Sequence, residues 1–229
     1  MKLASLKDGR DGRLVIVSND LAWFTDAAHI APTLQAALDG WETCEPQLRG
    51  LAESLEHGAV PRARFHEHEA ASPLPQASPL GPRDDRPLAG DVAGEVAVIL
   101  GDTPQGCARE AALAAIRLVM LGAGGVFSPV AITPDALPAW KDGRLSGVLQ
   151  LELNGRALAE PDTGTLVPDF GALIVEQAQN GPLKAGAVVR SGAAARTPTL
   201  NAGDVVRVEM RDLRHHTIFG AIEQAVAAP

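Results

Sequence analysis

Residues 91–101, with the sequence DVAGEVAVILG, constrain the fold more than any other segment of this chain. Val92 and the run at 96–100 supply the β-branched and apolar side chains that a buried strand requires. Gly101 and Asp102 end this run with residues that favour a turn. We therefore expect a central buried strand here, with a sheet built around it.

The rest of the chain predicts many short strands and few helices, which together indicate the α+β class. Residues 107–121 carry apolar residues at helical spacing, and the GAGG sequence at 122–125 is expected to end that helix. Residues 214–227 are expected to begin extended and to finish as a helix. Further strands are expected at 3–6, 13–18, 127–133, 147–153, 156–160, 187–191 and 203–210, and further helices at 32–38, 44–56 and 167–179.

A proline-rich stretch divides the chain. Residues 71–90 contain five prolines and predict a linker. We expect an N-terminal module of a hairpin and helices at 1–70, and a core domain at 91–229. A length of 229 residues suits such an arrangement.

The composition argues against several classes of partner. The formal net charge is −8, aromatic residues make up 3% of the chain, and there is no Tyr. An acidic chain with few aromatic side chains lacks the surface that nucleic acids or anionic membranes bind. The most basic stretch, at 207–214, contains Glu209 and Asp212, so it predicts a solvated face. We expect no nucleic-acid and no membrane partner.

Cysteine usage and the N-terminal sequence bear on the compartment. Cys44 and Cys107 lie far apart and form no CxxC motif, which is typical of free thiols in a reducing compartment. The first twelve residues have no apolar run of the kind that a signal peptide carries. No stretch is long and apolar enough to span a membrane. These features predict a cytoplasmic protein.

Two histidine motifs are candidate sites. In the FHEHE sequence at 65–69, an extended backbone would place His66 and His68 on one face, where both could bind a metal ion. A structural zinc site needs about four ligands, and the sequence identifies no third, so an exposed polar strand is the alternative. In the second motif, His215-His216, a residue such as His216 could act as a general base. A surface turn is the alternative there.

A series of short segments, taken in order, resembles the fumarylacetoacetate hydrolase superfamily. No single segment is decisive, but their number and order indicate this family. The resemblance implies a mixed β-roll or β-sandwich core with few helices, preceded by a small N-terminal module. The segments lie at 1–18 (MKLASLKDGRDGRLVIVS), 31–35 (APTLQ), 71–75 (ASPLP), 95–99 (EVAVI), 116–121 (IRLVML), 127–134 (FSPVAITP), 153–155 (LNG), 183–189 (LKAGAVV), 202–206 (AGDVV) and 218–222 (IFGAI).

The family uses a divalent metal, usually Mg²⁺ or Mn²⁺, held partly by an E-x-E pair on the core strand. Residues at i and i+2 of a strand face the same way, so two carboxylates can hold one hard cation. The pair falls here on Ala93 and Glu95, so one carboxylate is absent. Glu95 is then a remnant metal ligand. It is also a candidate acid or base if its surroundings are apolar; pairing with an Arg, or exposure in an open pocket, is the alternative.

Other functional parts of the family pattern are also missing. The loop with a metal Asp and a lysine, expected after Leu121, is reduced to the GAGG sequence. The segment with the catalytic His, expected after the ASPLP sequence, is nearly gone. Ala193 follows the Ser191-Gly192 pair, where the family has a substrate-binding Thr. The resemblance therefore implies a shortened, degenerate member in which the metal-dependent chemistry is lost.

Three functions stay open. The first is a protein with no cofactor that binds a keto-acid or polyketide-like molecule, with a possible metal-free isomerase or cyclase activity through Glu95. The second is a non-catalytic partner, as a homodimer or as a heterodimer with a full-length homologue. The third is a metal-dependent C–C bond hydrolase or decarboxylase that uses Mg²⁺ or Mn²⁺. A truncated or engineered variant of such an enzyme is a further alternative.

Overall fold

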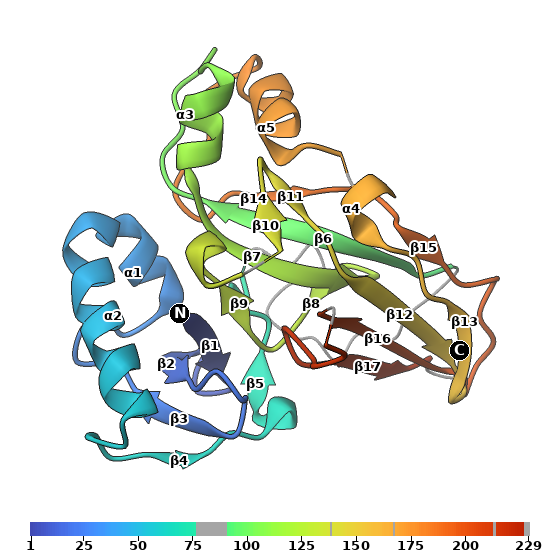
Figure 1. The fold of residues 1–229 in the computed structure, drawn as a ribbon, viewed down its shortest axis with the longest axis horizontal. Helices are drawn as coiled ribbons and strands as arrows, with labels where there is room; N and C mark the ends of the chain where they lie inside the picture. Colours follow the sequence, from blue (N-terminus) through green and yellow to red (C-terminus); the bar gives the residue numbers. More distant parts are fainter. Residues whose placement is uncertain (77–90, 138, 167, 213, 227–229) are drawn as a thin grey trace.

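The computed structural model describes residues 1–76, 91–137, 139–166, 168–212 and 214–226. Most of its regular elements are strands, as expected for the α+β class, and they form one large sheet and two smaller ones (Figure 1). The helices are α1 (Leu34–Asp39), α2 (Trp41–Glu56), α3 (Arg109–Ala114), α4 (Thr163–Leu166) and α5 (Phe170–Ala178), with the 3-10 turns η1 (Glu67–Glu69) and η2 (Pro134–Ala136).

The large sheet contains strands from both halves of the chain. Its members are β1 (Lys2–Leu6), β2 (Arg13–Val17), β3 (Trp23–Asp26), β4 (Ala63–Arg64), β5 (Ala70–Ala71), β6 (Ala93–Leu100), β7 (Ile116–Ala123), β8 (Val126–Phe127), β9 (Ala131–Ile132), β14 (Val188–Arg190) and β15 (Ala195–Arg196). The other two sheets contain β10 (Trp140–Lys141) with β11 (Arg144–Leu145), and β13 (Arg156–Ala159), β12 (Val148–Leu153), β16 (Val205–Arg211) and β17 (Ile222–Ala225).

The first strand connects the two halves of the chain. On one side β1 pairs antiparallel with β2, which completes the expected hairpin. On its other side β1 pairs with β9, where Lys2 lies opposite Ile132. The main path of the sheet therefore runs β14-β6-β7-β9-β1-β2-β3-β4. The residues expected to form a separate N-terminal module thus share one continuous sheet with the core.

The expected central strand is β6. It pairs with β14 on one side and with β7 over nearly its whole length on the other. Its alternate side chains enter two apolar clusters, because successive residues of a strand face opposite ways. Val96, Val98 and Leu100 belong to the larger cluster, and Ala97 and Ile99 to the cluster that includes β1 and the helices α1 and α2.

The predicted helix at 107–121 is wrong over most of its length. Only α3, Arg109–Ala114, is helical, and residues 116–123 form strand β7. The run IRLVML is short, apolar and partly β-branched, so periodicity alone does not separate a buried strand from a helix. The GAGG sequence does not end a helix. Gly124 and Gly125 adopt positive φ angles of 58° and 92° in the turn between β7 and β8.

Two further expectations need correction. The C-terminal segment forms strand β17 instead of a helix, as far as the described residues extend. The FHEHE motif is not extended throughout, because Glu67–Glu69 forms the 3-10 turn η1. The Glu67 carboxylate accepts a hydrogen bond from the Ala221 backbone N–H at 2.9 Å. This contact, between residues that are far apart in the sequence, favours the turn over a strand.

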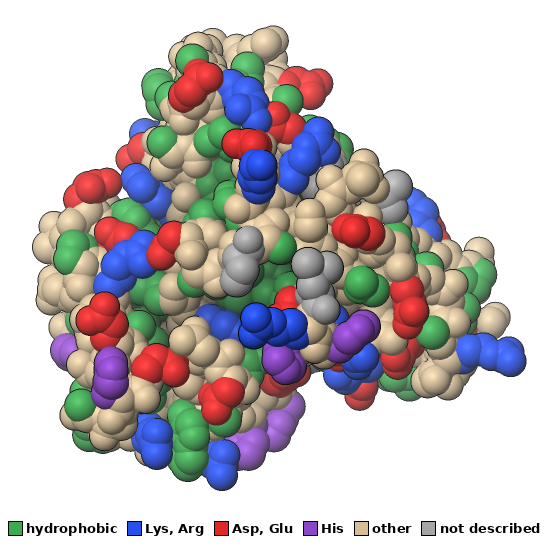
Figure 2. All heavy atoms as spheres, in the orientation of Figure 1, with side chains coloured by type: hydrophobic (Ala, Val, Ile, Leu, Met, Phe, Trp, Pro, Cys, Tyr) green, Lys and Arg blue, Asp and Glu red, His purple; other side chains and the backbone are tan. Residues whose placement is uncertain are grey.

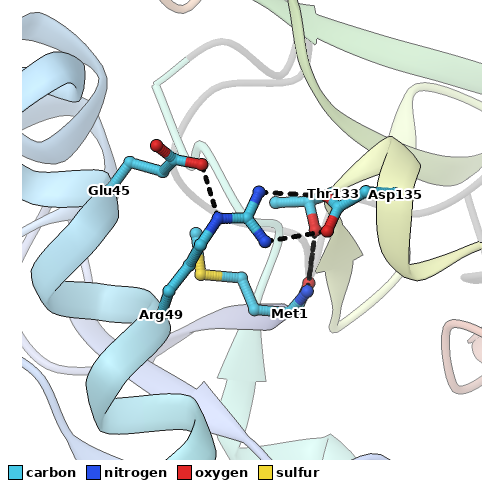
Figure 3. A network of polar contacts seen from close by, with 5 residues as sticks. All are labelled: Met1, Glu45, Arg49, Thr133 and Asp135. Carbon is cyan, nitrogen blue, oxygen red and sulfur yellow. Dashed lines mark hydrogen bonds and ion pairs between the residues drawn. The ribbon is translucent and has the colours of Figure 1, made fainter.

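A polar network fixes α2 to the core (Figure 3). Arg49 donates to both carboxylate oxygens of Asp135, at 2.8 and 3.1 Å, and to Glu45 at 2.6 Å. The hydrogen bonds from Arg49 lower the pKa of Asp135 to about 2. Beside them, the amino group of Met1 donates to Thr133 Oγ1 at 2.7 Å. The network orients η2, which lines the large cleft described below.

Candidate functional site

Glu95 is buried on β6 and is bound by an arginine. Only 3% of its side chain is exposed. Arg190, at the end of the neighbouring strand β14, donates from Nε to Glu95 Oε1 at 2.5 Å, and its Nη2 contacts the same oxygen. The structure thus shows the arginine pairing that the sequence left as an alternative. Because the carboxylate is already engaged, the geometry does not favour Glu95 as a free acid or base.

The surroundings of Glu95 explain one glycine of the GAGG sequence. Gly122 lies directly opposite Glu95 in the β6–β7 ladder. A Cβ atom at Gly122 would lie 3.1 Å from Glu95 Cγ and 3.3 Å from the Phe127 ring. This close approach requires the neighbours to move for any larger residue, so a glycine here leaves room for the buried carboxylate.

The donor set around Glu95 does not fit a divalent metal. Ala93, two residues earlier on β6, has no side-chain atom that could bind a metal ion. The Oε1 atom of Glu95 is already held by the Arg190 guanidinium. Among the described residues, no three His, Cys, Asp or Glu side chains come close enough together to hold a metal ion. Mg²⁺ and Mn²⁺ prefer several oxygen ligands, which this part of the chain does not supply.

His66 and His68 lie beside a second, smaller cavity. Their ring centroids are 5.6 Å apart, so the two side chains do lie together as expected. The cavity has a volume of about 520 Å³ and is also lined by Lys7, Phe127 and Glu223. Within the described residues, no third His, Cys, Asp or Glu side chain joins the pair in a group that could hold a metal ion, so metal binding by the two histidines stays a prediction.

The other cavity, larger than the one beside His66 and His68, is an open cleft between the first strands and the core. Its volume is about 1210 Å³. Figure 2 shows the face of the molecule that is hollowed near its centre, where Lys, Arg and His side chains gather around the opening. Apolar side chains line much of the cleft, and polar ones come from β1, the β2–β3 turn, β16 and the segment that follows it. The apolar residues include Ile132, Leu137, Leu145 and Ile218.

His216 lies on the rim of this cleft. It is exposed, and its Nδ1 lies 3.7 Å from Asp212 Oδ2. The backbone N–H groups of His216 and Arg214 both donate to Asp212, and these bonds outweigh burial and lower the pKa of its carboxyl. The neighbouring His215 has a positive φ of 63°, which is uncommon for a residue with a side chain. The expected surface turn is therefore present, but it borders a cavity.

Lys2 is the most unusual residue of the cleft. Only 9% of it is exposed, although it carries an ammonium group. Its Nζ donates to the backbone oxygen of Ile218 at 3.1 Å. Burial lowers the pKa of Lys2 to about 8, against the attraction of Glu56, Asp20 and Asp212. The amine is thus closer to neutral at physiological pH than a solvated lysine is.

A charged triad on β16 contributes Glu209 and Arg211 to the cleft and Arg207 to the smaller cavity. Glu209 is only 6% exposed, and it accepts from Arg207 at 2.8 Å and from Arg211 at 2.5 Å. Burial alone would raise the pKa of Glu209, but the hydrogen bonds from the two arginines lower it overall. The stretch at 207–214 is therefore only partly the solvated face expected from its sequence, because its central carboxylate is buried.

The structure does not bring the sequence-predicted residues into one site. Glu95 lines neither cavity, while His66 and His68 line the smaller one and His216 the larger one. Sequence reasoning missed Lys2 and Arg190. Lys2 had a signal, since it is a charged residue beside the apolar pattern of β1. Arg190 had none, because its partner is 95 residues away in the chain.

Comparisons with known proteins place these residues in a family. Residues 1–76 match the family model described as fumarylacetoacetase N-terminal domain 2. Residues 122–227 match the model described as fumarylacetoacetate (FAA) hydrolase C-terminal. A search of the curated proteins found no match. None of the described helices has the length and apolar character needed to cross a membrane.

Solved structures have the same fold. Maleylpyruvate hydrolase from Sphingobium sp. SYK-6, in complex with manganese(II) and pyruvate, is 19% identical with a TM-score of 0.72, and the match covers 99% of both chains. Fumarylacetoacetate hydrolase from the psychrophile Exiguobacterium antarcticum is 16% identical with a TM-score of 0.69, and the match covers 100% of both chains. At this identity the likeness establishes the fold alone, and it confirms the expected architecture.

Proposed function

The chain belongs to the fumarylacetoacetate hydrolase superfamily, and we propose that it is a member that binds a small carboxylate-bearing molecule without a divalent metal. One observation carries this proposal. The buried Glu95, at the position where the family has a metal ligand, is bound by the Arg190 guanidinium instead. A fixed organic cation then provides the positive charge that a metal ion supplies in metal-dependent relatives.

Arg190 has unused donors for such a ligand. A guanidinium group has five N–H donors in a planar fork. Nε and Nη2 both contact the single oxygen Oε1 of Glu95. The Arg190 side chain is 42% exposed, so its remaining N–H groups are accessible to a carboxylate from solution. Pairing of this kind is directional, because the carboxylate meets two parallel donors.

Glu95 then has a supporting role and no catalytic one. Its carboxylate orients the guanidinium and offsets part of its charge. A metal-free isomerase or cyclase reaction would consequently need a proton acceptor other than Glu95, and the proposal for this site is limited to binding. A homodimer, or a heterodimer with a full-length homologue, stays a prediction.

Calorimetric titration with pyruvate tests the proposal. Pyruvate is the small keto acid present in the related maleylpyruvate hydrolase structure. We expect it to bind the chelator-treated protein and the Mn²⁺-supplemented protein equally well. Arg190→Gln is expected to weaken binding at least about tenfold, since it removes a charged hydrogen-bond donor worth about 1.5–3 kcal/mol.

A surface arginine provides the matched control. Arg196 lies on β15, which also pairs with β6, and its ion pair with Asp91 is more than half exposed on both sides. Arg196→Gln is expected to leave pyruvate binding unchanged. Equal losses in the two variants, or binding only in the presence of Mn²⁺, would contradict the proposal.

The alternative is a metal-dependent C–C bond hydrolase or decarboxylase. It draws support from the related hydrolase that was solved with manganese and pyruvate. It requires metal ligands outside the described residues, because none of the described clusters offers three. Pyruvate binding that depends on Mn²⁺ and on Glu95 would favour this alternative.

A further inference from the structure

The large cleft contains a group that the Glu95–Arg190 site does not explain, the buried amine of Lys2. The sequence positions Lys2 at the start of β1, between β2 and β9, where both neighbouring strands are buried. Its side chain reaches the cleft and lies within the electrostatic range of Asp20, Asp212 and Glu56. Lys2 thus combines burial, access to a cavity and nearby acidic groups.

We propose that the cleft is a second ligand site, in which Lys2 condenses reversibly with the carbonyl group of an oxo acid that carries an apolar chain. A cavity of about 1210 Å³ accommodates a ligand larger than pyruvate. Its apolar wall, formed in part by Ile132, Leu137 and Leu145, suits a hydrocarbon chain.

The chemistry is that of an imine. The unprotonated Nζ of Lys2 adds to the carbonyl carbon and forms a carbinolamine. The former carbonyl oxygen then takes up a proton and leaves as water, and a C=N bond joins the ligand to Lys2. Water reverses the reaction, and no oxidant or reductant takes part. A desolvated lysine in an apolar pocket is suited to this step, because the neutral amine is the nucleophile.

Neighbouring polar groups fit the same step. His216 and Asp212, which also line the cleft, supply groups that can exchange a proton with the carbinolamine. Arg214 has an exposed side chain in the lining and supplies a cation for the ligand carboxylate.

A purely structural role for Lys2 makes a different prediction. The hydrogen bond to Ile218 would hold the segment after β16 against β1, and the amine would then be engaged and unreactive. Reactivity towards a carbonyl compound separates the two roles. The other lysines, Lys7, Lys141 and Lys184, are exposed and serve as internal references.

Reductive trapping is the experiment. The protein is incubated with pyruvate or a longer 2-oxo acid and with cyanoborohydride, which delivers hydride to an imine carbon, and the modified lysine is located by peptide mass spectrometry. We expect the adduct on Lys2 at least about tenfold faster than on the exposed lysines at about pH 7. Lys2→Met should abolish it, whereas Lys184→Arg should not.

The pH profile adds a readout that survives if Lys2→Met fails to fold. Trapping at Lys2 should rise with a midpoint near about pH 8, whereas exposed lysines have midpoints near about 10.4. Asp20→Asn removes one of the charges that favour the ammonium form, together with Glu56 and Asp212, so it should move the midpoint to lower pH. Asparagine keeps the acceptor oxygen that binds Ser18 and Ala22.

Two outcomes would overturn the proposal. One is labelling at Lys2 that is no faster than at the exposed lysines. The other is a pH profile of trapping at Lys2 that Asp20→Asn leaves unchanged. The cleft and the Arg190 site are separate. The Arg190→Gln variant is therefore expected to trap the oxo acid on Lys2 as well as the native protein does. The failure of one proposal can therefore be told from the failure of the other.

Discussion

Replacing Arg190 tests the pairing at the centre of the proposed function. Arg190→Met keeps an apolar stem and removes the guanidinium, which leaves the Glu95 carboxylate charged, 3% exposed and without its cation. Breaking a buried ion pair by removing one partner costs about 3–5 kcal/mol. Arg190 itself is 42% exposed, so water replaces part of the lost interaction. We expect a loss of about 2 kcal/mol in the free energy of unfolding.

The assay is urea denaturation at about pH 7, supported by thermal melting. For a domain of this size, 1 kcal/mol corresponds to about 2–4 °C in melting temperature, so Arg190→Met should melt about 6 °C below the native protein. Glu95→Gln combined with Arg190→Met should lose less than Arg190→Met alone, because no buried charge then stays uncompensated. This non-additivity measures the coupling between the two residues.

Arg196→Met breaks a largely exposed pair and should change stability by less than about 0.5 kcal/mol. If Arg190→Met were no more destabilising than Arg196→Met, the buried pairing of Glu95 would be refuted.

Other predictions concern the contacts around the cleft. Arg49→Met should lower the free energy of unfolding by about 1 kcal/mol, as measured by urea denaturation. This difference from the native protein should be present above about pH 4 and should disappear as the pH falls through about 2, the folded-state pKa of Asp135. The native protein should gain stability relative to Lys2→Met between about pH 8 and 10.5, by at most about 3 kcal/mol, because the unfolded chain binds the proton more tightly over that range. Gly220→Ala should cost about 2 kcal/mol by the same assay, since φ is 74° and a Cβ atom would lie 2.9 Å from Glu67.

Local sequence patterns predicted the strands well where the pattern was unambiguous. A central strand was predicted within residues 91–101, where β6 lies, because an apolar, β-branched run between turn residues has few other interpretations. Residues 116–121 were misassigned because a short run with five apolar residues in six fits either a helix or a strand. Pairing with β6 over its length decides for the strand. That pairing is a long-range interaction that no local window contains.

The candidate site was less accessible from sequence for the same reason. Glu95 was identified from the family pattern, and its pairing with an arginine was one of the alternatives, but the pattern did not identify Arg190. Lys2 acquires its properties from β9 and Ile218, which come from the other half of the chain. Burial and charge at these positions depend on how the fold brings the two halves of the chain together.

Titration of the metal-free protein with Mn²⁺ tests the central claim most directly. If Arg190 supplies the positive charge at Glu95, isothermal calorimetry should show no saturable heat at Mn²⁺ concentrations up to about 1 mM, a range in which a carboxylate-rich metal site would fill. Glu95→Gln should then give the same trace as the native protein. Binding of about one Mn²⁺ per chain that disappears in Glu95→Gln would contradict the account, because it would show that Glu95 is a metal ligand and that Arg190 does not replace the ion.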